Sequence, residues 1–389
     1  MDRPFCVIKS ASMRYIRFFL TLLCLLSFCL TASAMPDISG TYKALANFTK
    51  STATKEGISS FLQRLRLEFK PKLTKNIELN VTYDHEMLLH DFANTADFGL
   101  LRQKNQRSLA WMDGDQVLTD RDHFYEKHSL YRCYLKFESA HSRWTFGKQL
   151  VDWGRLRFFS PLDLFNQPLP SDIEPEERLG FDALNIELFS NNFSGINFLY
   201  GPANREDQMS YGLRFYKKFG TYDTFLIAAR HEKEKVAGFG FDGYLGKAGF
   251  RGEFTYTKES KEAYPRAALG IDYSFPSKTT LTGEYFFNGA ANGDYDAFAD
   301  SLTEARKRLS LEKNLLSLSV VHELTPLLKL KGALIYDVDG ESAFFNPELR
   351  YNVKENVDVA IGSQLFVEDK GSEFENYNNV YYVELKFFF

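Results

Sequence analysis

The chain has 389 residues, of which 44% are hydrophobic and 16% aromatic, yet its mean hydropathy is −0.31. It carries 47 basic and 51 acidic side chains, a balance that excludes nucleic acid as a partner, because nucleic-acid-binding proteins need a basic surface. The texture of the sequence does not change after residue 40 and no linker divides it, so we expect one domain despite the length.

Residues 1–34 have the pattern of a secretory signal peptide. Basic residues precede an apolar run from Phe18 to Leu30, and small residues lead to an expected cleavage site after Ala34. The run is too short for a comfortable transmembrane helix. The mature domain is therefore expected to span residues 35–389.

From about residue 40 the sequence alternates in polarity over stretches of some ten residues, separated alternately by short and long polar connections. In "LRLEFK", Leu65 and Leu67 lie on one face and Arg64 and Arg66 on the other. In "LYRCYLKFE" the same rule places Tyr131, Cys133, Leu135 and Phe137 against Arg132, Tyr134, Lys136 and Glu138. This rhythm is typical of transmembrane β-barrels, whose strands alternate between lipid and lumen.

Eighteen such segments can be counted, and they start near residues 40, 61, 76, 128, 143, 181, 194, 209, 222, 238, 248, 264, 279, 313, 328, 343, 357 and 378. The first segment and the glycine-rich stretch 238–246 are the weakest, so sixteen strands stay open. We predict an all-β fold, a transmembrane antiparallel barrel of about eighteen strands. A barrel of about this size leaves an aqueous channel.

Five cations fall opposite the apolar residues of their strands and are predicted to line one wall of this channel: Arg64, Arg66, Arg132, Lys136 and Arg143. A basic wall favours small anionic solutes. Glu78 and Asp84 lie on the intervening strand and weaken that expectation.

The densest motif is "GKQLVDWGRLRFFSPLDLFNQ" at residues 147–167. It resembles a pattern of porin-like and alginate-export-like outer-membrane barrels, in which Gly-Lys-Gln at a strand end leads to Trp-Gly and then to Pro-Asp-Leu-Phe-Asn. The sequence departs from the pattern at Ser160 and Gln167. A loop of about thirty residues follows, and loops this long are usually functional. We expect it to fold inward, so that Arg155 and Arg157 meet solutes while Trp153 anchors the loop. The alternative is that the aromatic residues only pack the loop against the wall.

The chain ends on "NNVYYVELKFFF". One face of this tail consists of apolar residues throughout: Tyr381, Val383, Leu385, Phe387 and Phe389. The tail resembles the closing strand of bacterial outer-membrane barrels, a resemblance that implies recognition by the barrel-assembly machinery. Taken alone, it also fits an edge strand of a soluble sandwich.

Together these features predict a porin-like channel for passive diffusion of small hydrophilic solutes, in the outer membrane of a Gram-negative bacterium. The expected partners are outer-membrane lipid and lipopolysaccharide, and self-association into homo-oligomers stays open. The alternative function is an export conduit for an alginate-like polysaccharide. Neither Gly-x-Ser-x-Gly nor His-Glu-x-x-His occurs, so we expect no enzyme activity, and no metal or other cofactor is predicted.

Overall fold

The computed structural model describes residues 38–51, 55–91, 111–112, 114–166, 170–190, 193–259, 262–293, 309–367, 371–375 and 377–389. The expected signal peptide, residues 1–34, lies outside the described residues. Among those described, no helix has the length and apolar character needed to cross a membrane. The strands and the single 3-10 turn of the described part are β1 (Ile38–Lys50), β2 (Gly57–Phe69), β3 (Ile77–His90), β4 (Gln116–Arg121), β5 (Phe124–Glu138), β6 (Ser142–Gln149), β7 (Phe181–Ser190), β8 (Ser194–Gly201), η1 (Glu206–Gln208), β9 (Ser210–Phe219), β10 (Tyr222–His231), β11 (Glu234–Leu245), β12 (Ala248–Glu259), β13 (Glu262–Ser274), β14 (Thr279–Asn288), β15 (Asn314–Glu323), β16 (Leu328–Asp337), β17 (Ala343–Lys354), β18 (Val357–Val367) and β19 (Val380–Phe388).

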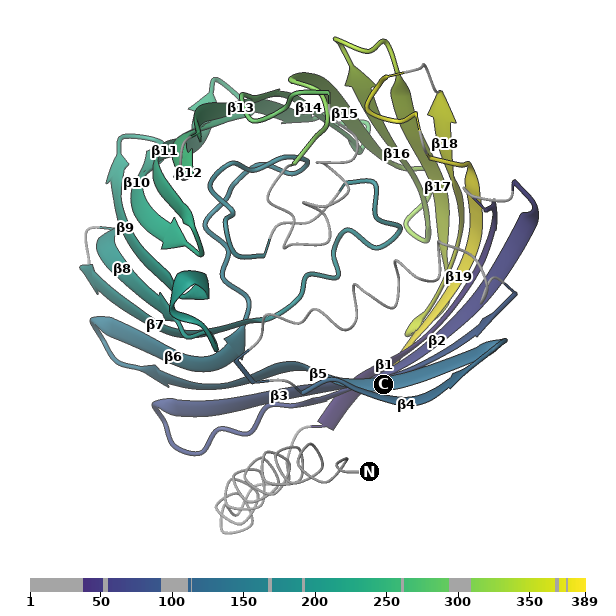
Figure 1. The fold of residues 1–389 in the computed structure, drawn as a ribbon, viewed down its shortest axis with the longest axis horizontal. Coiled ribbons are helices and arrows are strands. Elements are labelled where there is room, and N and C mark those ends of the chain that lie inside the picture. Colours follow the sequence, from purple (N-terminus) through teal and green to yellow (C-terminus); the bar gives the residue numbers. More distant parts are fainter. Residues whose placement is uncertain are drawn as a thin grey trace, which may run out of the picture.

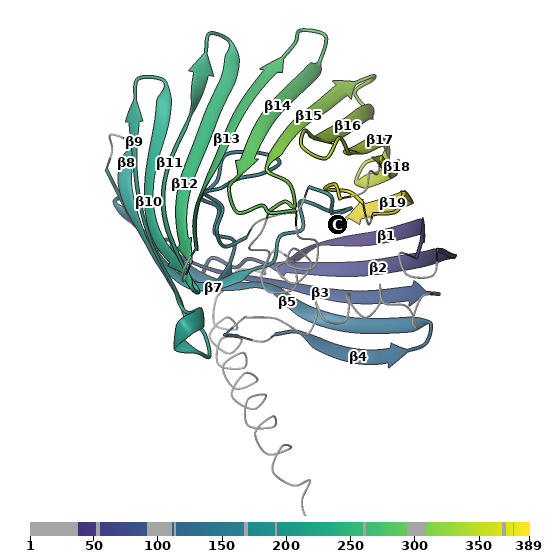
Figure 2. The ribbon, with the colours of Figure 1, turned by 45° about the horizontal axis from the view of Figure 1, so that its top comes forward.

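Eighteen of these strands close into an antiparallel ring (Figure 1). Neighbours in the ring are consecutive strands except at β3 and β5, and β19 returns to pair with β1 from Thr41↔Phe388 to Phe48↔Tyr381. Figure 2 shows the C-terminus beside β19 and β1, at this closing seam. Closure pairs the first and the last strand of the ring, so neither is left as an open edge.

The short strand β4 stands outside the ring. β3 pairs directly with β5, while β4 pairs only with the first residues of β5, from Gln116↔His128 to Arg121↔Phe124. It therefore extends the β5 flank beyond the end of β6, which pairs with β5 from Cys133 to Glu138.

The predicted barrel is confirmed, and each predicted strand begins within about four residues of an observed one. Both doubtful segments form strands, β1 and β11, so the count is eighteen rather than sixteen. The sequence did not predict β4, because its six residues, QVLTDR, have no two-residue alternation of polarity and lie within a long connection between predicted strands.

Alternation sorts the two faces of the barrel, as β19 illustrates. Tyr381 and Val383 are 54% and 44% exposed, whereas Tyr382 and Glu384 between and after them are 4% and 5% exposed. The exposed set faces outward, where a barrel in a membrane meets lipid. Other strands show the same apolar outer surface, including Phe198, Leu213, Phe215, Leu226, Phe239, Phe254, Leu269, Leu316 and Leu318.

The described residues of the segment between β6 and β7, 150–166 and 170–180, are called here the inner loop. It runs through the interior of the ring, where Figure 1 shows it in teal. Two apolar clusters form where the loop meets the wall. One contains Val151, Trp153, Leu162, Ala183, Leu199, Ile227 and Val236. The other contains Phe158, Phe159, Ala268, Phe286, Leu309, Leu315, Ile335, Phe344 and Phe374.

Candidate functional site

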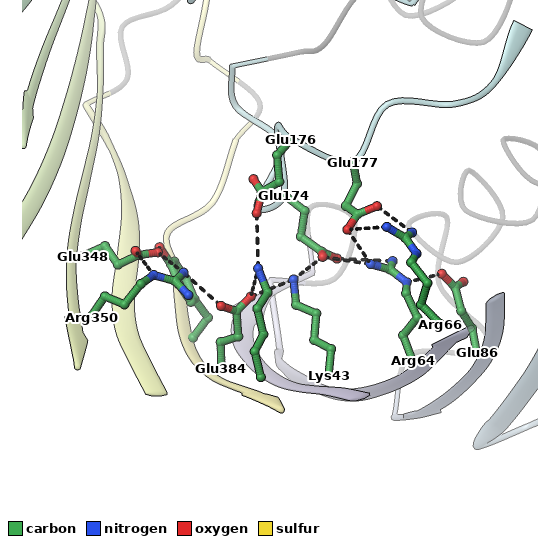
Figure 3. Close-up of polar contacts among 12 residues, drawn as sticks. Lys43, Arg64, Arg66, Glu86, Glu174, Glu176, Glu177, Glu348, Arg350 and Glu384 are labelled. Carbon is green, nitrogen blue, oxygen red and sulfur yellow. Dashed lines mark hydrogen bonds and ion pairs between the residues drawn. The ribbon is translucent and has the colours of Figure 1, made fainter. Parts of the chain in front are cut away.

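The inner wall formed by β1 and β2 is joined by ion pairs to the inner loop (Figure 3). Lys43 on β1 and Arg64 on β2 both contact the carboxylate of Glu174, with Arg64 Nη1 2.9 Å from Oε1. Arg66 places Nη2 2.8 Å from Oε2 of Glu177. Alternate residues of a strand share a face, so Arg64 and Arg66 point into the barrel together.

Carboxylates of the neighbouring strand β3 hold the same arginines from the wall side. Asp84 Oδ2 lies 2.6 Å from Nη2 of Arg66, and Glu86 Oε1 lies 2.6 Å from Nε of Arg64. Asp84 is only 2% exposed. Each arginine is thus fixed between a wall carboxylate and a loop carboxylate, which compensates for the loss of water around the charges.

The chain of ion pairs continues from Lys43 along the other side of the closing seam. Glu384 on β19 lies 2.6 Å from Lys43 Nζ, 2.9 Å from Arg350 Nη2 on β17 and 3.5 Å from Lys386 Nζ. Glu348 binds Arg350 in turn, at 2.9 Å from Nε. The network therefore crosses the seam where the ring closes.

Arg132 lies beside the network but has different partners. Its guanidinium donates hydrogen bonds to the backbone oxygens of Tyr131 and Arg178 and lies 4.1 Å from the centre of the Tyr131 ring. Arg66 stacks on the same ring at 3.8 Å. Tyr131 thus faces inward, although alternation predicted it outward. A β-bulge in the pairing of β3 with β5, next to this residue, shifts the register.

Lys136 and Arg143 form a separate group, beside the short turn 139–141. Lys136 Nζ is 3.2 Å from Glu78, and Arg143 is 2.9 Å from Glu138 and 3.1 Å from Glu187. The structure therefore divides the five cations that were expected on one wall into two groups. The first is Arg64, Arg66 and Arg132, and the second is Lys136 and Arg143.

Two wall carboxylates hold the backbone of the inner loop from the opposite side of the ring. Glu253 on β12 accepts hydrogen bonds from Leu162 N at 3.0 Å and from the Ser160 hydroxyl at 2.7 Å. Glu284 on β14 accepts bonds from the backbone N–H groups of residues 157 and 158, at 2.7 and 2.9 Å. Loop backbone inside a barrel needs such partners, because an unpaired buried N–H group costs about 1–3 kcal/mol.

Inward-facing glycines make room for the apolar side chains of the loop. A Cβ atom at Gly212 on β9 would lie 2.4 Å from the ring of Trp153, and one at Gly240 on β11 would lie 2.6 Å from Leu162. Gly270 on β13 receives Leu156 in the same way, at 2.7 Å. Trp153 is 2% exposed and stacks edge-on against Phe165, so it holds the loop to the wall.

The loop arginines Arg155 and Arg157 lie near different strands, Arg155 beside β9 and β10 and Arg157 beside β14. Arg155 and Arg214 both lie over the ring of Phe225, with guanidinium carbons 5.0 and 4.4 Å from its centre. Arg157 is bound through its backbone to Glu284, and its side chain is exposed. No ion pair of the Arg157 guanidinium is found within the described part of the chain.

The surroundings shift the pKa values of two carboxyl groups of the inner loop in opposite directions. Burial, together with the charge of Asp152, raises the pKa of Asp163 to about 7, although Arg178 donates to it at 2.7 Å. Burial also opposes ionisation of Glu177, but Arg64 and Arg66 outweigh it and hold the pKa of Glu177 below its ordinary range.

Several residues of this site were not predicted from the sequence: Lys43, Glu174, Glu177, Glu253 and Glu284. Alternation could have placed the strand residues among them on the inner face. For Glu174 and Glu177 the only signal was the acidic stretch "EPEE" inside a long loop.

One group of carboxylates has the spacing of metal ligands. Oxygen atoms of Glu312, Asp337 and Asp339 lie within 4.8 Å of one another. Asp337, however, accepts hydrogen bonds from the backbone N–H groups of Asp339 and Gly340 and from the Ser342 hydroxyl. We interpret this group as a turn closed by Asp337, and we assign no metal or other cofactor to it.

No protein-family model matches the sequence, and no curated protein is significantly similar to it. Solved structures match the fold over nearly the whole chain. OccK9 (OpdG) of Pseudomonas aeruginosa has a TM-score of 0.60 at 10% identity, covering 90% of this chain and 97% of that one. OccAB3 of Acinetobacter baumannii has a TM-score of 0.55 at 12% identity, covering 90% and 98%. OpdK of Pseudomonas aeruginosa, solved with vanillate, has a TM-score of 0.55 at 7% identity, covering 91% and 98%. At such identities the likeness is one of fold.

Proposed function

We propose that this chain, which has the fold of the Occ and Opd outer-membrane porins, is a passive outer-membrane channel for small hydrophilic solutes. The observation that carries the proposal is a closed ring of eighteen strands with an apolar outer face and charged side chains inside. A ring of this size is wide enough to hold water, and the inner loop narrows it. Passage then depends on the size of the solute and on the charges it meets.

In this proposal the basic side chains act at different levels of the lumen. Arg64, Arg66 and Arg132 line the wall at the seam, and Arg155 and Arg157 line the loop. Lys136 and Arg143 line the lumen near turn 139–141. Trp153 supports the loop without contacting solute, because it is buried. Residues 1–34 act as the export signal, and the face that ends on Phe389 is recognised during assembly in the membrane, where lipid and lipopolysaccharide surround the barrel.

The second function considered, export of an alginate-like polysaccharide, is not favoured. An acidic polymer needs a continuous basic path, whereas Asp84, Glu86 and Glu384 alternate with the cations of the seam. The solved structures with the same fold are porins rather than enzymes, and we propose the same for this chain.

The test is conductance in planar bilayers together with uptake into vesicles. Purified, heat-modifiable protein is expected to give stepwise current increases and to admit monosaccharides while retaining a large dextran. Vanillate is a suitable first charged solute, because OpdK was solved with it. Folded protein that inserts but gives neither current nor uptake would refute the proposal. Release of the dextran would indicate a leak rather than a channel.

A further inference from the structure

The ion pairs that cross the seam between β1 and β19 and continue onto the neighbouring strands are called here the seam network. The side chains of this network that belong to the barrel wall have an excess of positive charge. Within the described part of the chain, four acidic wall side chains, Asp84, Glu86, Glu348 and Glu384, are linked by ion pairs to seven cations, Lys43, Arg64, Arg66, Lys127, Lys331, Arg350 and Lys386. With every group ionised, the wall members carry three positive charges more than negative ones. A lumen lined by such a surface attracts anions.

The inner loop supplies three glutamates to this surface. Glu174 binds Lys43 and Arg64, Glu177 binds Arg64 and Arg66, and Glu176 lies 3.4 Å from Lys386. The three negative charges bring the fourteen side chains to a net charge of zero. Figure 3 shows Glu174 and Glu177 reaching from the loop to the wall arginines.

The three glutamates differ in how closely they engage the wall. The side chains of Glu174 and Glu177 are 14% and 21% exposed, and each makes at least two ion pairs with the wall. Glu176 is 57% exposed and makes one long pair with Lys386, which already binds Glu384. Only the first two cover arginines that would otherwise face the lumen.

We propose that Glu174 and Glu177 are the specificity-determining residues of the channel: tethered counter-ions that cover the basic seam and keep the lumen from selecting anions strongly. The expected effect on the selectivity of transport rests on the proposed channel function. The covering of the arginines by the two glutamates rests on the ion-pair geometry alone. Removal of the two charges leaves the inner loop attached elsewhere. Glu253 and Glu284 accept hydrogen bonds from its backbone, and the spaces above Gly212, Gly240 and Gly270, called here the glycine recesses, hold its apolar side chains.

The first test is the reversal potential of single channels in a salt gradient. E174Q/E177Q is expected to raise the chloride permeability and lower the potassium permeability, each by about twofold per removed charge, the size Coulomb's law gives for unit charges about 8 Å apart in water. E176Q removes one charge from the same segment and is the matched control. A shift for E177Q no larger than that for E176Q overturns the proposal, because the ion pairs with the wall would then not matter.

The second test needs no current, so it separates this inference from the channel function. Ser171, whose backbone oxygen accepts a hydrogen bond from Gln364 on β18, is replaced by cysteine in a C133A background, which removes the one free thiol among the described residues. The rates of reaction with an anionic and a cationic thiol reagent are then compared in detergent. E174Q/E177Q should raise the anionic-to-cationic rate ratio and E176Q should change it little. An unchanged ratio in the double variant contradicts the inference even if the protein conducts, whereas a raised ratio in a protein that does not conduct leaves only the channel function refuted.

Discussion

At the scale of single residues, Asp163 is a carboxyl group held away from water inside the inner loop. It is 2% exposed, its oxygen accepts a bond from Arg178, and Asp152 binds the same arginine at 3.0 Å. Burial raises the pKa of Asp163 to about 7, well above the value of about 3.9 expected when the loop is undocked. The docked loop therefore binds this proton more tightly than the undocked loop.

The sign of the pH effect follows from that difference. The stabilisation from protonated Asp163 is fully present below about pH 4 and is lost as the pH rises through about 7. In a W111F/W144F variant only Trp153 reports, since the chain has three tryptophans. Quenching of Trp153 by acrylamide should increase as the pH rises from about 4 to about 7. D163N should lose this change. An identical pH profile in D163N would assign the effect to another group.

The glycine recesses show what a sequence reveals at this scale and what it does not. The two-residue alternation indicates that Gly212 and Gly240 face inward. It cannot indicate that Trp153 and Leu162 fill the space above them, because these partners are about 60–80 residues away in the chain. Trp153 was predicted as the anchor of the loop, but its recess becomes visible only in the folded barrel.

At the scale of elements, the strands were predictable and the loop contacts were not. Each full strand has its own alternation and turn residues, so β7, β8 and β10 begin at the predicted residues. The bulge at Tyr131 was missed because β-bulges depend on pairing between strands rather than on composition. The division of Lys136 and Arg143 from the other cations was missed for a related reason: alternation gives the face of a strand but not the height at which a residue meets its partner.

The attachment of the inner loop to β12 and β14 leads to a prediction at this scale. E253A/E284A removes acceptors for backbone N–H groups at residues 157, 158 and 162, each worth roughly 1.5–3 kcal/mol as a charged hydrogen bond. The loop should leave this wall, so single-channel conductance should rise and Trp153 should become easier to quench.

E348A is the control for that experiment. Glu348 is also an inward carboxylate, but its ion-pair partners Lys331 and Arg350 belong to the wall. Its loss should change charge selectivity with little change in conductance. Equal conductance in E253A/E284A and the unmodified protein would mean that the glycine recesses alone hold the loop.

At the scale of the whole molecule, the seam between β1 and β19 closes the barrel. Phe389 exchanges two backbone hydrogen bonds with Gly40, at 2.8 and 3.0 Å, and its ring lies where a Cβ atom of Gly40 would be. The last pair of the seam therefore requires glycine at position 40, because a side chain there would overlap the ring of Phe389. Because the ring is at the end of the seam, most of the β1–β19 pairing is independent of it.

F389A should separate folding from assembly in the cell. The variant is expected to refold in detergent with nearly normal heat-modifiable migration, since the backbone bonds remain, whereas the folded protein recovered from outer membranes should fall severalfold. F388A changes the same residue type one position earlier, on the other face of β19. Equal losses for F388A and F389A would show that the apolar face is not what the assembly machinery recognises.

The strands differ in length around the ring. β2, β3 and β5 have 13, 14 and 15 residues, whereas β6 and β8 have 8 each. About 9–11 residues are enough for a tilted strand to cross a membrane, so β2, β3 and β5 are longer than a crossing requires, and β4 pairs with the first residues of β5 (Figure 2). The ring is therefore uneven where the long strand β5 stands next to the short strand β6, and a large molecule approaching there would contact the hairpin of β4 and β5 before it reached the lumen.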